Sequence, residues 1–309
     1  MRGDGRTAGV LPLVKPVGPT SHDMVARARR WFPGRRVGHL GTLDPAAAGV
    51  LVLLVGGVTR AARFLDPPQG QKTYRAWVEF GLATDSGDAD GVVIRDTPVR
   101  DLTEERVRRA LEAQVGTYDQ IPPALSAVMV RGERAYRRTR AGESLDLEGR
   151  PVTVHRAELL VWRSPGFGSP RPRALVEYTV SRGTYVRALV RDLGEGAGEA
   201  AYVAALVRMR VGDVRQENCI TWEEAEGLAR EGLLEGRLLD VAALLTGWPE
   251  MIAPPDPHGR RIGRGLPAQG APEGWTRLVA GLGRPTWCLA RIEKGQFTEV
   301  VRLTEEVLP

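Results

Sequence analysis

The chain has 309 residues, of which 42% are hydrophobic and 26% charged, a composition that excludes wholesale disorder. Two cysteines and four histidines exclude a disulfide scaffold and a zinc finger, and no apolar run reaches the ~20 residues of a membrane helix. The length accommodates about two domains of the usual ~100–200 residues. The N-terminal sequence lacks a signal-peptide pattern, which predicts a cytoplasmic protein.

The formal net charge of +5 is unevenly distributed along the chain. Residues 1–66 contain ten basic and four acidic residues, and residues 156–215 contain ten and six. Residues 216–250, by contrast, contain two basic and eight acidic residues. This asymmetry favours a localised anionic partner over a general attraction to polyanions. We expect the acidic segment to face away from that partner.

Strand and helix patterns are interspersed along the first 245 residues, which predicts an α+β domain with a largely antiparallel sheet. The expected strands, marked by apolar runs or by alternation, are 10–14, 50–55, 72–80, 152–162, 173–180 and 204–211. The expected helices are one capped by Thr20 or Ser21, then 59–65, 103–115, 185–193 and one or two acidic helices in 222–245. Residues 38–45 are expected to contain no regular structure.

Segments rich in glycine, arginine or proline divide these elements. Residues 121–151 have little apolar pattern and predict an insertion. Residues 248–257 contain four prolines and predict a linker to a small β-rich domain. The glycines of 194–198 follow a helix, so we interpret them as a helix C-terminus and not as a phosphate loop.

Asp44 has two interpretations. Pro45 and three alanines follow it, as they would follow a helix N-cap. Gly38 and Gly41, however, leave the backbone upstream free to approach a ligand closely. Arginines also flank this loop, and a carboxylate among arginines is either ion-paired or faces an anionic substrate. Asp44 is therefore a candidate catalytic carboxylate.

Other candidate residues have modest signals of their own. His39 lies between two glycines, and its flat polar ring is suited to slipping between stacked bases, although a solvated loop histidine is the commoner case. Tyr185 and Arg187 lie where a strand gives way to a helix. Tyr74 falls on the apolar face of its strand, where core packing is the default role.

Residues 38–51, GHLGTLDPAAAGVL, resemble the signature of the TruB family of tRNA pseudouridine synthases. Further segments resemble other motifs of that family, in the same order along the chain: 14–18, 20–23, 72–75, 84–91 and 181–187. Residues 261–265 resemble the start of a PUA domain, so the resemblance covers nearly the whole chain.

This resemblance implies an α+β pseudouridine synthase fold with a mixed, largely antiparallel sheet over residues 1–250, including an RNA-clamping insertion at about 121–155. Residues 251–309 would form a PUA-like RNA-binding domain. The implied activity is isomerisation of uridine 55 in the T-arm of tRNA to pseudouridine, without cofactor or metal. The expected partner is the T-arm stem-loop of tRNA. The enzyme is expected to be a cytoplasmic monomer that does not bind a membrane.

The resemblance also assigns roles to individual residues. Asp44 is the catalytic aspartate, and Arg187 pairs with it and orients it. Tyr74 stacks against the target base and assists proton transfer, while His39 takes the place of the flipped base in the T loop. The remaining matched residues line the uridine pocket: Asp88, Tyr185 and Leu206.

The chemistry is compatible with these roles. Isomerisation must break the bond between ribose C1′ and uracil N1, turn the base and rejoin it through C5. A stacked uridine cannot do this, so it must be flipped out at a cost of a few kcal/mol. An ionised carboxylate then acts as nucleophile or base in a site that excludes water. Attack on the base, attack on the sugar and abstraction of a sugar proton all stay open.

A non-catalytic RNA-binding or tRNA-folding module is the alternative function, because arginine patches and a PUA-like tail would suffice for it. It predicts that Asp44, as a helix cap, affects only stability, by about 1 kcal/mol. A carboxylate-dependent N-glycosidase is disfavoured, since no second catalytic carboxylate is apparent near the motifs.

Overall fold

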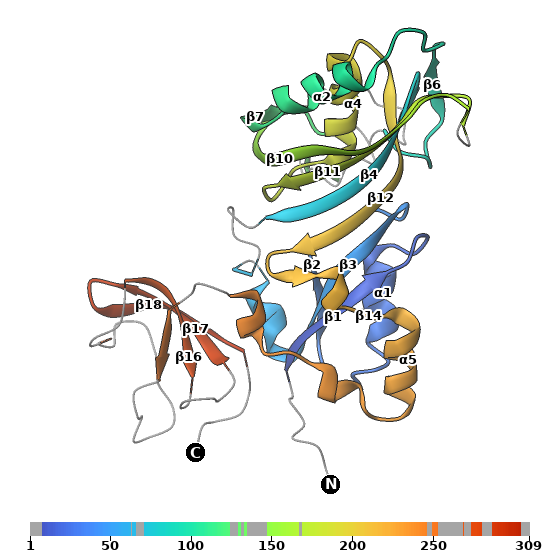
Figure 1. The fold of residues 1–309 in the computed structure, drawn as a ribbon. Helices are drawn as coiled ribbons and strands as arrows, with labels where there is room; N and C mark the ends of the chain where they lie inside the picture. Colours follow the sequence, from blue (N-terminus) through green and yellow to red (C-terminus); the bar gives the residue numbers. More distant parts are fainter. Residues whose placement is uncertain are drawn as a thin grey trace, which may run out of the picture. The chain divides into compact units, whose positions relative to one another are not determined.

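The computed structural model describes residues 8–62, 64–65, 71–123, 129–130, 133–134, 147–166, 169–245, 249–252, 268, 273–279 and 286–303 (Figure 1). The chain divides into two compact units. The first contains residues 1–45, 49–67 and 212–309, and the second contains residues 46–48 and 68–211. Several predicted segments lie wholly or largely outside the described residues: the PUA-like start at 261–265, residues 253–257 of the linker and most of the insertion at 121–155.

The strands at the core of the first unit pair in both the parallel and the antiparallel sense (Figure 1). β1 (Gly9–Lys15) pairs antiparallel with β3 (Ala47–Val55) and parallel with β14 (Ile220–Thr221). β2 (Val37–Leu40) pairs antiparallel with β3. β3 is buried along nearly its whole length, which explains why the sequence there is a continuous apolar run.

α1 (Ser21–Ala28) begins where the sequence predicts a cap. The Thr20 hydroxyl accepts from the Asp23 N–H, and the Asp23 carboxylate accepts from the Thr20 N–H, so two otherwise unpaired donors are satisfied. α1 and α5 (Trp222–Arg230) share one buried apolar core with the sheet. Its members include Leu11, Leu13, Met24, Val25, Ala28, Phe32, Leu51, Leu53, Trp222 and Ala225.

The acidic segment contains less α-helix than the sequence predicts. α5 ends at Arg230, and Gly232 adopts a φ of +72°, a conformation that glycine favours at helix ends. The remaining helical pieces of this unit are short 3-10 helices: η1 (Gly56–Ala61), η2 (Gln216–Asn218), η3 (Leu234–Arg237) and η4 (Val241–Leu244). The helix predicted over 59–65 is thus a 3-10 helix that begins earlier.

The C-terminal part of the first unit forms its own sheet. The strand order is β15 (Glu250–Ile252), β16 (Gly274–Val279), β17 (Thr286–Glu293) and β18 (Gln296–Arg302). The β15–β16 pair is parallel and the other two pairs are antiparallel. Leu278, Cys288 and Phe297 lie in its core. β15 falls inside the proline-rich segment, so part of the predicted linker is a strand.

The second unit is an antiparallel sheet with α2 (Glu104–Ala113) and α4 (Val186–Gly196) packed against it (Figure 1). Its strand order is β12 (Ala201–Val211), β4 (Lys72–Phe80), β11 (Arg173–Val180), β10 (Arg150–Arg163) and β7 (Gly116–Gln120). The predicted bounds of β4 and β11 are confirmed at both ends. α4 runs into the glycines of 194–198, which confirms their interpretation as a helix C-terminus.

Short strands complete the described part of the chain: β5 (Leu82–Thr84) with β6 (Val93–Asp96), β8 (Met129–Val130) with β9 (Glu133–Arg134), and β13 (Val214–Arg215). The elements confirm the predicted α+β class and the mixed, largely antiparallel pairing. Over the residues that are described, every helix is too short or too polar to cross a membrane.

Candidate active site

Asp44 lies in the connection between β2 and β3 of the first unit. Pro45 and Ala46 form a turn, and β3 begins at Ala47. Asp44 therefore caps no helix, and the helix-cap interpretation is wrong. The reason is that the apolar residues that follow are buried by pairing with β1, and this tertiary burial overrides the helix propensity of three alanines.

A buried serine holds the chain just before Asp44. The Ser21 hydroxyl donates to the Leu43 carbonyl at 3.0 Å and accepts from the Leu43 N–H at 2.8 Å. Ser21 is 1% exposed and is the first residue of α1, which is itself packed in the core. One hydroxyl thus satisfies both backbone groups of Leu43 and ties the loop to a rigid element.

The chain just after Asp44 is held by contacts to the backbone carbonyl of Pro45. The Gly18 N–H donates to the Pro45 carbonyl at 2.9 Å. Lys15, which is fully buried, has its Nζ 2.8 Å from the Pro16 carbonyl and 3.4 Å from the Pro45 carbonyl. Together with Ser21, these contacts fix the peptide groups on both sides of Asp44.

His39 lies on β2, opposite Leu53 of β3, and is partly buried. The expectation that residues 38–45 contain no regular structure is therefore wrong for the first three of them. Pairing with β3 holds the backbone extended there in spite of Gly38. Gly41 follows the strand with a φ of +70°, a conformation that an L side chain would resist.

In the second unit, three side chains of low exposure meet at the start of α4. Arg187 Nη1 donates to the Ser86 carbonyl at 2.7 Å, and Arg187 Nε lies 3.6 Å from Asp88 Oδ2. The Ser86 hydroxyl donates to Asp88 Oδ1 at 2.6 Å. Each of these residues is at most 7% exposed, so water does little to stabilise the Asp88 charge. The Arg187 guanidinium and the Ser86 hydroxyl stabilise it instead.

Glycines let the acidic loop of residues 84–91 approach α4. Gly87 has a φ of +75°, and a Cβ placed on it would lie 3.4 Å from the Arg187 Cβ. The Gly87 carbonyl accepts from the Val203 N–H of β12 at 3.0 Å. A Cβ on Gly91 would lie 2.2 Å from Ser86 Oγ, which is closer than the two atoms can approach. The loop is therefore closely packed on both sides of Asp88, which fixes the position of its backbone.

Tyr74 on β4 and Leu206 on β12 lie on neighbouring strands. Tyr74 pairs with Arg208, and Leu206 pairs with Ala76. Because paired residues and residues two apart share a face, Tyr74 and Leu206 lie diagonally on the same face of the sheet. Their exposed fractions are 8% and 9%, so both side chains are buried, and the fully buried Arg208 shares their face.

Tyr185 is the N-cap residue of α4, and its side chain makes no capping hydrogen bond. Gln120, the last residue of β7, holds its backbone. The Tyr185 N–H donates to Gln120 Oε1 at 2.8 Å, and Gln120 Nε2 donates to the Tyr185 carbonyl at 3.2 Å. Arg187 follows in the first turn of α4, which confirms that these two residues lie at the junction of a strand end and a helix start.

The candidate residues are thus divided between the two units. Asp44 and His39 belong to the first unit, and the expected pairing of Arg187 with Asp44 stays a prediction. The other candidates belong to the second unit: Tyr74, Asp88, Tyr185, Arg187 and Leu206. Within it, the structure brings Asp88 into contact with Arg187 and places Tyr74 beside Leu206.

Part of the basic charge that was expected to attract an anionic partner is neutralised by ion pairs within the protein. Arg35 Nη2 lies 2.9 Å from Glu235 Oε1. This ion pair joins the basic segment 1–66 to the acidic segment 216–250, so the charge sum of either segment overstates the charge it presents to a partner. Whether the acidic segment faces away from the partner stays a prediction.

Sequence reasoning missed residues that support the site without being candidates themselves: Lys15, Ser21, Ser86 and Gln120. Lys15 could have been noticed as one of only three lysines, placed at the end of an apolar strand. Ser21 lies in the segment 20–23 that resembles a family motif, and it is otherwise predicted only as a possible helix cap. Gln120 has no local signal, because its partner Tyr185 is 65 residues away along the chain.

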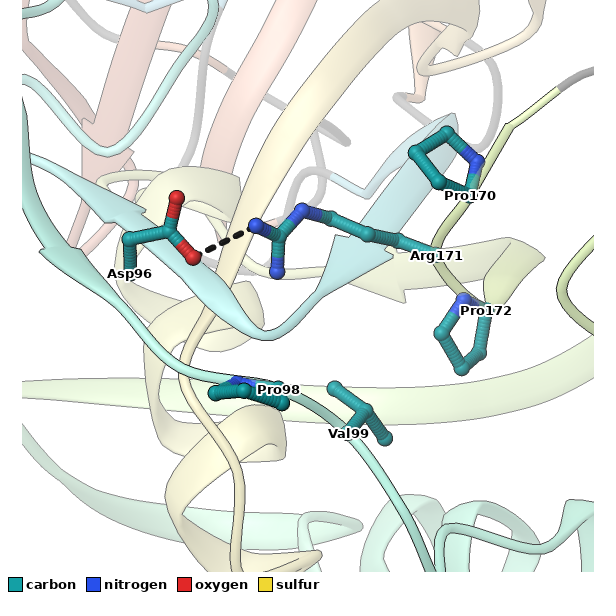
Figure 2. A pocket seen from close by; sticks show the side chains of 6 residues that line it. All are labelled: Asp96, Pro98, Val99, Pro170, Arg171 and Pro172. Carbon is teal, nitrogen blue, oxygen red and sulfur yellow. Dashed lines mark hydrogen bonds and ion pairs between the residues drawn. The ribbon is translucent and has the colours of Figure 1, made fainter.

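A hollow of about 250 Å³ in the second unit contains none of the candidate residues. Figure 2 shows the side chains that line it: Asp96, Pro98, Val99, Pro170, Arg171 and Pro172. Arg171 donates to Asp96 at 2.5 Å and also to the carbonyls of Gly81 and Thr97. Its guanidinium therefore serves to join segments of the protein to one another.

Comparison with known proteins agrees with these motifs. Residues 29–186 match the model of the TruB family pseudouridylate synthase N-terminal domain. A tRNA pseudouridine synthase B of Pelotomaculum thermopropionicum is 38% identical over 244 residues, which are 79% of this chain and 76% of that protein. The protein of the same name from Mycobacterium tuberculosis strain H37Rv is 40% identical over 266 residues, 85% of each chain.

A solved structure of a Cbf5-Nop10-Gar1 complex covers 98% of this chain and 85% of its own, with a TM-score of 0.68 and 22% identity, which shows a shared fold. The matched family model includes Asp44, Tyr74 and Asp88, and the sequence relatives extend the match well beyond it. Since the model covers more than half of the chain and the relatives cover most of it, this chain belongs to the TruB family of pseudouridylate synthases.

Proposed function

We propose that this enzyme isomerises uridine 55 in the T-arm of tRNA to pseudouridine, with Asp44 as the catalytic carboxylate. Relatives named tRNA pseudouridine synthase B support tRNA as the substrate. The observation that supports Asp44 most strongly is its setting. It lies in a non-helical loop whose peptide groups are tied to the core by Ser21 and Lys15, so a reactive side chain there is held on a rigid backbone.

In the proposed reaction the target uridine leaves the stack of the T loop, and His39 occupies the place that it vacates. The uracil then lies against Tyr74 and Leu206, whose low exposure supports a site that excludes water. Asp44 acts as nucleophile or base while the bond between C1′ and N1 breaks. The detached uracil turns and rejoins C1′ through C5. The C5 proton is released and N1 takes up a proton, so the product has the mass of the substrate.

Arg187 is proposed to orient Asp44 while it holds Asp88. A guanidinium carries five N–H donors in a planar fork, so it can serve Asp88, the Ser86 carbonyl and a further carboxylate at once. Asp88 and Tyr185 are proposed to line the uridine pocket. Their contacts with Arg187 and Gln120 would keep that pocket in shape before the substrate arrives.

Further parts of the chain are proposed to bind the rest of the RNA. Residues 150–155 belong to β10, so we place the RNA clamp at residues 121–149, between β7 and β10. Residues 251–309 are proposed as a PUA-like domain that contacts the tRNA. The enzyme is proposed to act as a cytoplasmic monomer without cofactor or metal.

The alternative, a non-catalytic RNA-binding module, loses one of its predictions, because Asp44 begins no helix and so does not act as a helix cap.

The experiment that tests the proposal is position-resolved mapping of pseudouridine in tRNA incubated with the pure protein, together with tritium release from 5-tritiated uridine. We expect modification at position 55 and a loss of roughly 10³-fold or more in turnover for Asp44→Asn, with RNA binding retained. Asp23→Asn is the matched control, because Asp23 is a real capping carboxylate and its loss should affect stability alone. Undiminished tritium release by Asp44→Asn would contradict the assignment.

A further inference from the structure

The α-helices that the structure describes differ in how they begin. α1, α2 and α5 each start after a threonine whose hydroxyl accepts from a backbone N–H of the first turn: Thr20, Thr103 and Thr221. α4 starts after Tyr185, whose side chain provides no such acceptor. A tyrosine at this position forgoes the stabilisation that a threonine would provide, which indicates that its ring has another use.

Gln120 binds the backbone of Tyr185 itself from outside the helix, and not the N–H groups of the first turn. Its carboxamide accepts from the Tyr185 N–H at 2.8 Å and donates to the Tyr185 carbonyl at 3.2 Å. Gln120 is 2% exposed, so these bonds are shielded from competing water. A rigid amide bonded to both backbone groups of one residue fixes where that residue's Cα lies and how its side chain leaves the backbone.

The same glutamine stands at the base of the segment 121–149. β7 ends at Gln120, and Gln120 pairs with Arg150, the first residue of β10, so this segment leaves and rejoins the sheet at one place. A second contact ties the base to α4, because Arg191 Nη2 donates to the Ile121 carbonyl at 3.3 Å. The position of Tyr185 is thus set by the edge of the sheet as well as by its own helix, in which the Leu189 N–H donates to the Tyr185 carbonyl at 3.1 Å.

We propose that Gln120 is a positioning residue for pseudouridine formation, which holds the Tyr185 ring at the place where it lines the uridine pocket. This inference rests on the proposed function, in which Tyr185 belongs to that pocket. Gln120 touches the backbone of Tyr185 and is not itself a catalytic residue. A misplacement of about 1 Å in a substrate-positioning group can lower turnover roughly 10²-fold, so the loss of this amide should act on kcat.

Gln114 offers a matched control in the same unit. It is also a buried glutamine whose Nε2 donates to a backbone carbonyl of α4, that of Leu189, at 2.8 Å. Its Oε1 accepts from the Tyr178 hydroxyl at 2.9 Å. The bond to Leu189 lies one turn further along α4, so Gln114→Leu removes a comparable buried amide without releasing Tyr185.

The test compares Gln120→Leu and Gln114→Leu with the wild-type enzyme on a T-arm stem-loop. Both variants should melt at lower temperature. Gln120→Leu should lower kcat roughly 10- to 100-fold while the KM and the affinity for the RNA change less than about twofold. Gln114→Leu should keep kcat within about twofold of the wild-type value. Equal kcat values for the two variants, whether lowered or not, would overturn the proposal.

Gln120→Glu adds a readout that a purely structural role would not predict. A protonated carboxyl can accept from the Tyr185 N–H and donate to the Tyr185 carbonyl as the amide does, whereas a carboxylate would face that carbonyl without a proton to share. Relative to the wild type, the kcat of Gln120→Glu should therefore rise as the pH falls. A constant ratio of the two kcat values across the pH range would count against the proposal.

A measurement without turnover separates this inference from the proposed function. The protein has six tyrosines, and labelling them with 3-fluorotyrosine gives fluorine resonances, of which that of Tyr185 is assigned through Tyr185→Phe. This resonance should shift in Gln120→Leu and stay in place in Gln114→Leu. An unmoved resonance would reject the positioning role. A wild-type enzyme that fails to modify the stem-loop would instead reject the proposed function and leave the fluorine result to decide on Gln120.

Discussion

Two regions are held in place by different kinds of contact. One is the Asp44 loop, residues 41–46 between β2 and β3, and the other is the Arg187 cluster, formed by Ser86, Asp88 and Arg187. At the Asp44 loop, the side chains of Ser21 and Lys15 bind backbone groups of the residues on either side of Asp44. At the start of α4, the side chains of Asp88 and Arg187 are themselves the binding groups, and both are buried. One region is fixed through the main chain and the other through charged side chains.

This difference has a consequence for how function and stability are linked. Contacts to peptide groups stay in place when the Asp44 side chain is changed, so its chemistry can be removed without dismantling the loop. At Arg187, function and stability cannot be changed independently, because removing the cation leaves the buried Asp88 carboxylate without its ion-pair partner. We therefore expect substitutions at Asp44 to affect turnover more than stability and substitutions at Arg187 to affect both properties.

The largest effect is expected for Arg187→Gln, which would break the comparison if it left stability unchanged. It should destabilise the second unit by about 3 kcal/mol, since Asp88 would keep its charge in a buried place without a cation. Turnover should also fall below detection. Calorimetric melting and tritium release measure the two effects.

Arg187→Gln combined with Asp88→Asn provides the control for this explanation. If the uncompensated carboxylate is the cause, the second substitution should recover part of the lost stability and none of the turnover. A double variant that melts no higher than Arg187→Gln would show that the ion pair is not what stabilises this region.

An intermediate effect is expected for Ser21→Ala, which sharpens the comparison at the other region. Two backbone groups of Leu43 would lose their partner, at a cost of about 1–3 kcal/mol, and turnover should fall roughly tenfold because the Asp44 loop is less well placed. Melting temperature and kcat on a T-arm stem-loop measure both.

Thr20→Ala is the matched control, one residue earlier in the chain. It removes the cap of α1 at a cost of about 1 kcal/mol but leaves Leu43 bonded, so kcat should not change. If both variants lost turnover alike, the integrity of α1 and not the Ser21 hydroxyl would be what the Asp44 loop requires.

The smallest effect concerns alkaline pH and Tyr118, a half-buried tyrosine of the second unit. Burial first, and the Asp192 carboxylate second, raise the pKa of Tyr118 to about 12 from its ordinary value. An unfolded chain would ionise Tyr118 near pH ~10. The stability that Tyr118 contributes is therefore complete below that pH and is lost as the pH rises towards the folded value.

Tyr118→Phe should therefore reduce the decline of the melting temperature above pH ~10 and change it little at neutral pH. Burial also raises the pKa of Tyr178, which stays in the variant, so part of the decline should persist. Identical slopes for the variant and the wild type would show that Tyr118 does not contribute to the alkaline instability.

Elements that are determined by residues close together in the sequence were predicted well. β4 and β11 have their predicted bounds, because alternation along an extended chain is a property of consecutive residues. α1 is capped by Thr20 for the same reason, since its cap partner Asp23 is three residues away. The segment around Asp44 was enough to indicate the family, because an uninterrupted motif needs no tertiary information.

Elements whose cause is distant were predicted wrongly or not at all. Asp44 followed by proline and alanines looks like a helix start, but pairing of β3 with β1 decides its conformation. Strand β2 forms across Gly38 because β3 lies beside it. Gln120 was missed entirely, since nothing near it in the chain distinguishes it from any other strand-end glutamine.

By itself, the sequence determined the α+β class, the order of most strands and helices, and a motif that carries the candidate catalytic carboxylate. Only the tertiary structure decided which groups hold the candidate residues in place. Arg187 reaches a carbonyl 101 residues away, and Gln120 holds a tyrosine 65 residues away. Such contacts exist only after the chain has folded, because local propensity acts over a few residues whereas buried polar groups take whichever partners the packed core brings to them.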